Sequence, residues 1–178
     1  MRAAVLGSVA LLGLAACGTP EQESSSASKT AAVPPVTAPA ARQVTDTERA
    51  AMLAALGAEQ GATRKVWFAM PPNDPEAASL KSAFEGVFKQ AGWQTETQTI
   101  TGMVLKPGLS ILIASEEPPS YVSTAQRALE STSFEFKTGT GYRPYYEDRK
   151  KADPNWPGIP LGPDQEFVVV VGPRPPAS

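Results

Sequence analysis

The feature that most constrains the fold is a regular alternation of strand-like and helix-like segments between residues 64 and 172. Short runs that are apolar or alternate in polarity are typical of strands, and longer stretches with apolar residues at helical spacing separate them. The expected strands are 65–70, 93–100, 109–114, 134–138 and 167–172, and the expected helices within this stretch are 74–91 and 118–131. Strands that alternate with helices favour an α/β fold in which the helices cover a mostly parallel sheet.

The strongest helical signal lies between Asp74 and Gly92. Asp74 is a favourable cap, Pro75 suits the first helical position, and Gly92 suits a terminus with positive φ. The side chains that recur at helical spacing form one apolar stripe: Ala77, Leu80, Phe84, Val87, Phe88 and Ala91. This stripe predicts a helix that packs on the sheet.

A shorter helix is expected before the first strand. Thr45 and Glu48 have the spacing of a capping box, and Met52, Leu53 and Leu56 form a narrow apolar stripe that ends at Gly57 or Gly61. Because it has few apolar residues, we expect this helix at the edge of the domain.

We therefore expect a single small α/β domain over residues 45–178, with a mostly parallel or mixed sheet of four to five strands covered by two to three helices. The connection from Ile100 to Leu109 is short for a crossover, so a ferredoxin-like split βαβ arrangement of the α+β class is an open alternative. The layout of residues 64–176 resembles small domains of uncharacterised bacterial membrane proteins. That resemblance implies no active site.

The first residues read as an export signal. Arg2 is followed by an apolar run over residues 3–13, and a positive start before a brief apolar stretch is typical of secretory signals. The run is shorter than the roughly 20 residues that a membrane-spanning helix needs. We therefore expect residues 1–16 to be a signal peptide.

The only cysteine in the chain stands directly after this run. Leu14, Ala15, Ala16 and Cys17 resemble the lipobox of bacterial lipoproteins. The resemblance implies cleavage between Ala16 and Cys17, a diacylglycerol on the Cys17 thiol and an acyl chain such as palmitate on its amine. Two or three acyl chains anchor a protein stably to a bilayer. Gly18 follows where an aspartate would imply retention in the inner membrane, so in a host with two membranes we expect the outer one, facing the periplasm.

Residues 17–44 are rich in Ser, Thr, Ala and Pro, which predicts a lipidated, disordered tether that holds the domain on the order of 30 Å from the membrane. Loss of residues 1–16 removes only Arg2 and changes the net charge from −2 to −3. A weakly acidic chain offers no electrostatic footprint for nucleic acid, so none is expected as a partner.

The chain has no histidine, and Cys17 is assigned to the lipid. We therefore expect no catalytic triad, metal or cofactor, although an enzyme that uses carboxylates remains open. Glu116 and Glu117, between an expected strand and an expected helix, are the candidates for such a hydrolase, but acidic residues also favour helix N-termini. The run at 108–112 lacks the second glycine of a nucleophile elbow, and Pro144 replaces the third glycine of a dinucleotide motif with no helix expected after it.

Residues 139–165 form a long expected loop in which aromatic and basic residues gather. The candidate interaction residues are Tyr142, Arg143, Tyr145, Tyr146, Arg149 and Trp156. Tyr, Trp and Arg are enriched in protein interfaces, and long loops in compact domains are often functional. We expect a non-catalytic binding or scaffolding domain that contacts another envelope protein. A cell-wall glycan-binding module and the hydrolase are alternatives, and the rings could also simply pack over the sheet edge.

Overall fold

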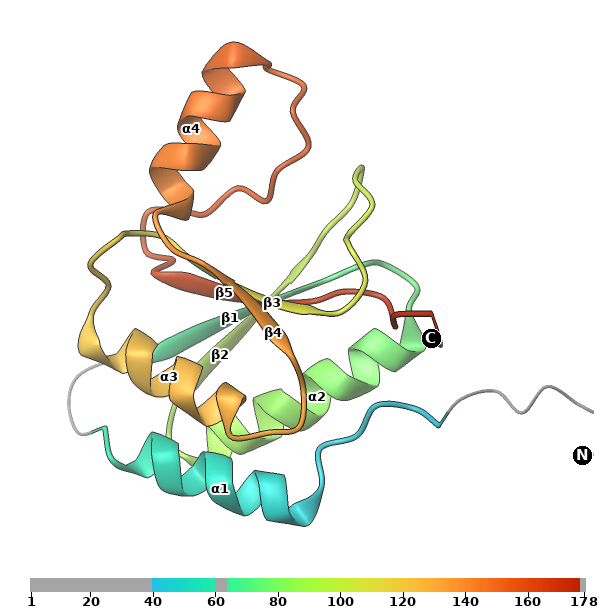
Figure 1. Cartoon of the computed structure of the whole chain (residues 1–178), viewed down its shortest axis with the longest axis vertical. Coiled ribbons are helices and arrows are strands. Elements are labelled where there is room, and N and C mark those ends of the chain that lie inside the picture. Colours follow the sequence, from blue (N-terminus) through green and yellow to red (C-terminus); the bar gives the residue numbers. More distant parts are fainter. Residues whose placement is uncertain (1–39, 60–63, 177–178) are drawn as a thin grey trace, which may run out of the picture. The chain divides into compact units, whose positions relative to one another are not determined.

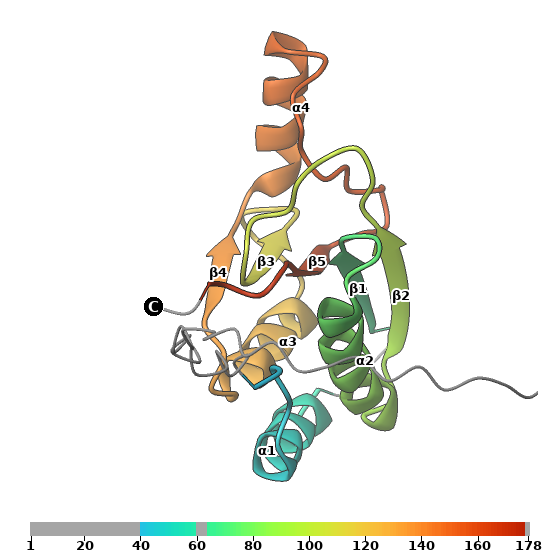
Figure 2. The same ribbon diagram turned by 90° about the vertical axis from the view of Figure 1, so that its right-hand side faces the viewer.

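The computed structural model describes residues 40–59 and 64–176. Five strands form one mixed sheet in the order β2-β1-β5-β3-β4 (Figures 1 and 2). The strands are β1 Lys65–Met70, β2 Gln94–Thr99, β3 Leu109–Ile113, β4 Phe136–Gly139 and β5 Phe167–Val171, and the helices are α1 Asp46–Gly57, α2 Pro75–Gln90, α3 Ser120–Glu130 and α4 Tyr142–Ala152. The predicted α/β class and the predicted strands are confirmed, with one helix more than expected.

The sheet consists of two βαβ units that run in opposite directions. In each unit, β1-α2-β2 and β3-α3-β4, the two strands are parallel neighbours. The last strand, β5, lies between the units, parallel to β1 and antiparallel to β3. Because β1 and β5 separate β2 from β3, the short connection between β2 and β3 forms no hairpin, and the ferredoxin-like alternative does not apply.

Helices α2 and α3 cover one face of the sheet, and α1 packs against these two helices on their side away from the sheet (Figures 1 and 2). The predicted stripe of α2 is buried here, and Phe84 and Phe88 are fully inaccessible. Phe88 packs edge-on against Phe68 of β1, with ring centroids 5.9 Å apart. Burial of each such side chain contributes about 1.5–3 kcal/mol, so this face forms the main core.

The predicted N-terminal caps of α1 and α2 are both present. Asp74 accepts a hydrogen bond from the Ala77 N–H at 2.9 Å. Thr45 and Glu48 form the capping box, in which the Thr45 N–H donates to Glu48 at 2.8 Å. Glu48 also accepts a hydrogen bond from the Ser133 N–H at 2.7 Å. These hydrogen bonds, the largest from Ser133, lower the pKa of Glu48 to about 2.

Helix α4 corrects the expectation of a long loop without a helix after Gly141. Gly141 has a φ of 62°, which turns the chain into the helix. Pro144 fits the first turn because the N–H that it lacks would have no partner there. The helix buries none of its residues and rises away from the sheet (Figures 1 and 2). In the described ranges, every helix is too short or too polar to cross a membrane.

Candidate functional site

The second face of the sheet is covered by two irregular segments instead of helices. These are the β2–β3 loop, residues 100–108, and the segment of residues 153–166 that leads from α4 back to β5. They enclose a second, smaller apolar core. Ile100, Leu105 and Ile159 of the two segments pack there against Ala69 of β1 and against Val168 and Val170 of β5. We call α4 together with residues 153–165 the finger.

A groove of about 630 Å³ lies between the β2–β3 loop and the finger. Its floor is formed by sheet residues: Ser110, Leu112 and Val170. One wall is formed by residues 103–106 of the β2–β3 loop, and the other by finger residues: Tyr142, Tyr145, Trp156, Pro157, Gly158 and Ile159. Three of the predicted interaction residues, Tyr142, Tyr145 and Trp156, therefore line the groove. They face the β2–β3 loop, which the sequence did not indicate as an interaction surface.

Two large apolar side chains at this groove are exposed to solvent. Val104 of the β2–β3 loop is 91 % exposed and Tyr145 of α4 is 52 % exposed. In the part of the chain that the structure describes, these are the exposed large hydrophobic residues, and both line the same groove. Single exposed apolar residues are ordinary, but two that line the same concave surface make this groove a candidate binding site.

The aromatic residues of the finger pack on one another. Trp156 lies edge-on to Tyr145 and Tyr146, with ring centroids 5.6 and 5.8 Å apart. Arg149 lies over the Trp156 ring, with its guanidinium carbon 5.4 Å from the ring centroid. A Cβ atom at Gly158 would overlap the Trp156 ring, so glycine is required where the chain passes it. Tyr146 and Arg149 thus support the finger from behind the groove.

Hydrogen bonds fix the base of the finger to the sheet. The Arg143 N–H donates to the Ala114 carbonyl at 3.0 Å, and its guanidinium donates to the carbonyls of Gly162 and Gln165 at 3.0 and 2.9 Å. The Ile159 N–H donates to the Tyr142 hydroxyl at 2.9 Å, and burial raises the pKa of that hydroxyl. Arg143 therefore has an internal role, and these hydrogen bonds hold the base of the finger without a partner.

Of the two candidate carboxylates, Glu116 lies at the base of α4. Glu116 accepts a hydrogen bond from the Thr140 hydroxyl at 3.1 Å, and a Cβ atom at Gly141 would overlap its carboxylate. This places Glu116 against the turn that starts α4, where a negative charge is favourable. Glu117 is exposed. Among the described residues, no three His, Cys, Asp or Glu side chains form a group that could hold a metal ion.

A second hollow, of about 490 Å³, lies over β1 and β2 on the other side of the segment that leads back to β5. Trp67, Gln98 and Asp164 are among the residues that line it. The Trp67 indole N–H and the Gln98 side-chain oxygen are buried and have no hydrogen-bond partner in the described chain. Each unpaired buried polar group lowers the stability of the fold by about 1–3 kcal/mol. A ligand that supplied hydrogen bonds to this donor and this acceptor would remove that cost.

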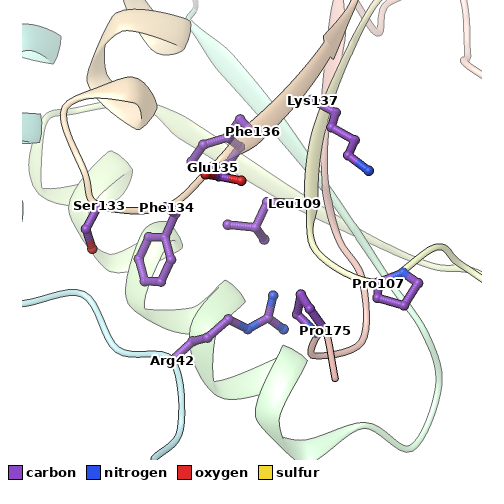
Figure 3. Close-up of a pocket in the computed structure, with 9 residues that line it drawn as sticks. All are labelled: Arg42, Pro107, Leu109, Ser133, Phe134, Glu135, Phe136, Lys137 and Pro175. Carbon is purple, nitrogen blue, oxygen red and sulfur yellow. The ribbon is translucent and has the colours of Figure 1, made fainter. Parts of the chain in front are cut away.

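A third hollow, of about 650 Å³, lies where β3 and β4 begin (Figure 3). The Arg42 guanidinium points into it between Phe134 and Pro175 (Figure 3). Arg42 is bound to Glu76 of α2 at 2.6 Å and to the Gly172 carbonyl at 2.9 Å. The hydrogen bonds from Arg42 lower the pKa of Glu76. Arg42 thus connects the segment before α1 to α2 and to the end of β5. Residues 133–137 line the other side of the hollow.

No protein-family model, no curated protein and no solved structure matches this chain. Leu14, Ala15, Ala16 and Cys17 lie outside the described residues. The groove residue that sequence reasoning missed is Val104. The signal that could have found it is the apolar trio 103–105 between two glycines, where a plain turn would be polar.

Proposed function

We propose that this chain is a lipid-anchored protein of the bacterial cell envelope whose α/β domain binds a segment of another envelope protein in the groove. The lipobox-like residues Leu14 to Cys17 support the anchor, because two or more acyl chains hold a protein stably to a bilayer. In a host with two membranes the anchor is in the outer membrane and the domain faces the periplasm. The domain has a binding or scaffolding role and catalyses no reaction.

The observation that carries the binding role is the exposure of Val104 and Tyr145 on opposite walls of one groove. An apolar side chain of a partner that enters between them removes apolar surface of both proteins from water. Each Å² so buried contributes about 25 cal/mol. The Leu112 and Val170 floor favours an apolar occupant, whereas the Tyr145 hydroxyl at the rim suits the polar backbone of a peptide.

The order of the finger strengthens this proposal. Binding costs free energy when loops and side chains must first become ordered. The Trp156 packing and the Arg143 hydrogen bonds already hold the finger in place. An extended apolar segment of the partner therefore meets a surface that is already in its binding conformation.

The test replaces the two exposed groove residues and asks which proteins co-purify from crosslinked envelopes. Tyr145→Ala and Val104→Glu should each lose a partner that the wild type retains, with unchanged circular-dichroism spectra. Tyr145→Phe and Val104→Ile are matched controls that keep the apolar surface and should retain the partner. Identical partner sets for all five proteins would refute the binding role of the groove.

The anchor has a separate test. Cys17→Ser removes the thiol that would be acylated, so the variant should stay unprocessed or leave the detergent phase in phase partitioning. A variant that partitions with detergent and is processed as the wild type is would refute lipidation at Cys17.

A second candidate function, glycan binding, is favoured by the unpaired Trp67 N–H and Gln98 oxygen at the second hollow. A sugar hydroxyl both donates and accepts hydrogen bonds, so it matches the chemistry of both groups, which a side-chain movement would first have to expose. Asp164 beside them could accept from a further hydroxyl. The purified protein should then co-sediment with cell wall, and Gln98→Leu should abolish this. Equal sedimentation of the two proteins, or none of either, would remove this candidate.

A further inference from the structure

We propose that the free edge of β4 pairs with β4 of a second copy of this chain, in an antiparallel and two-fold symmetric dimer. The two five-stranded sheets then join into one continuous sheet. This surface is separate from the groove, and the proposal does not depend on the proposed function.

Strand β4 has a neighbour on one side only. It is the last strand in the sheet order and pairs with β3 (Figure 2). The side chains of Lys137 and Thr138 of β4, and of Glu135 directly before it, are exposed. An edge strand presents unpaired N–H and C=O groups, which makes it a template for another strand.

The side chains of this edge divide between its two faces, because successive residues of a strand point to opposite sides. Phe134 and Phe136 turn to the main core, where both rings contact Phe84, with centroids 5.7 and 6.0 Å away. Glu135 and Lys137 therefore point together to the other face. In the described part of the chain neither of them forms an ion pair or a hydrogen bond, so both charges remain available to a partner.

The charges favour one register for self-pairing over its two neighbours. In an antiparallel pair, two facing residues point their N–H and C=O groups either towards each other or away from each other, so in a two-fold symmetric pair the axis lies midway between the two copies of one residue. With the axis at Phe136, Glu135 faces Lys137 of the second copy, and Lys137 faces its Glu135. An axis at Glu135 or at Lys137 would instead place like charges opposite each other, which is unfavourable. The sequence Glu-Phe-Lys is thus complementary to itself.

The two edges of the sheet differ in their charge pattern. At the β4 edge, the exposed residues Glu135 and Lys137 carry opposite charges. The opposite sheet edge, β2, lacks such a charge pattern. Its one charged side chain, Glu96, already pairs with Lys65 at 3.3 Å. These differences assign the second copy to the β4 edge.

The test is a charge swap measured by sedimentation equilibrium of the full chain in density-matched detergent micelles, over a concentration series. Glu135→Lys and Lys137→Glu each place like charges opposite each other twice in the dimer. Each should weaken association by about tenfold or more, equivalent to about 1.4 kcal/mol at 25 °C. The double variant with both substitutions restores opposite charges and should associate as the wild type does.

A mixture of the two single variants provides the matched control. One chain then carries two lysines and the other two glutamates at the facing positions, so the mixture should form a heterodimer although neither variant associates strongly alone. The proposal is overturned by a wild type that stays monomeric throughout the series, or by single variants that associate as strongly as the wild type. It is equally overturned if neither the double variant nor the mixture regains association, because the charges would then not set the register.

Discussion

The carboxylate of Glu48 offers the sharpest test of how α1 is fixed to the domain. Glu48 is 9 % exposed and caps α1 through Thr45 while it accepts a hydrogen bond from Ser133, which lies between α3 and β4. The Glu48 carboxylate therefore accepts hydrogen bonds both at the start of α1 and from the segment between α3 and β4. The perturbation is Glu48→Gln, which keeps the size of the side chain and removes its charge.

The pKa of Glu48 sets the expected magnitude. Its decrease from 4.5 to about 2 on folding corresponds to about 3 kcal/mol of stability. Glutamine retains part of the hydrogen bonding, so we expect Glu48→Gln to lower the free energy of unfolding by about 2–3 kcal/mol at pH 7. Because the folded-state pKa is depressed, this contribution is complete above about pH 5 and is lost as the pH falls towards 2.

The assay is urea denaturation of the wild type and Glu48→Gln at pH 7, 4.5 and 3. The difference between them should be largest at pH 7 and should fall to less than half by pH 3. Glu147→Gln, which changes an exposed carboxylate on α4, is the control and should stay within about 0.5 kcal/mol of the wild type. A Glu48→Gln difference that is independent of pH, or below about 0.5 kcal/mol at pH 7, would refute the reasoning.

Three further outcomes follow from the contacts of the finger and of the segment before α1. Arg143→Ala removes the side-chain hydrogen bonds that hold the base of the finger, so trypsin should cleave within α4 faster than in the wild type. The far-ultraviolet circular-dichroism spectrum should keep most of its signal. Unchanged cleavage would contradict this role of Arg143. In Gly158→Val the new side chain would overlap the Trp156 ring, so trypsin should cleave the finger faster than in the wild type. An unchanged rate of cleavage would contradict the close packing at this position. Arg42→Ala removes the guanidinium that pairs with Glu76, so thermal unfolding should occur at a lower temperature at pH 7. Because this guanidinium lowers the pKa of Glu76, the difference from the wild type should shrink as the pH falls below the ordinary range of a glutamate, and an equal decrease at neutral and acidic pH would contradict this ion pair.

Helices and strands that bury an apolar face were predicted from the sequence, whereas α4, which buries no residue, was not. The apolar stripe of α2 and the all-buried run of β5 follow directly from periodicity. Helix α4 buries no residue, so it has no apolar face to recognise, and its early Pro144 argued against a helix. The position of β5 between the two βαβ units depends on tertiary pairing, which periodicity does not encode.

The residues of the candidate site were likewise predicted only in part from the sequence. Composition singled out Tyr145 and Trp156, because aromatic residues in a polar stretch are unusual. It could not separate residues that line the groove from Arg143, which hydrogen-bonds within the finger. Val104 was missed because its short apolar run, residues 103–105, lies in a turn-like segment, and only the fold brings it to the same groove as Tyr145.

Site-specific photocrosslinking in living cells tests the central claim most directly. A photoreactive amino acid at position 104 or 145 should yield an adduct with a second envelope protein, whereas the same amino acid at the exposed position 90 of α2 should yield none. Absence of an adduct from both groove positions, or the same adducts from all three positions, would contradict a partner-binding groove.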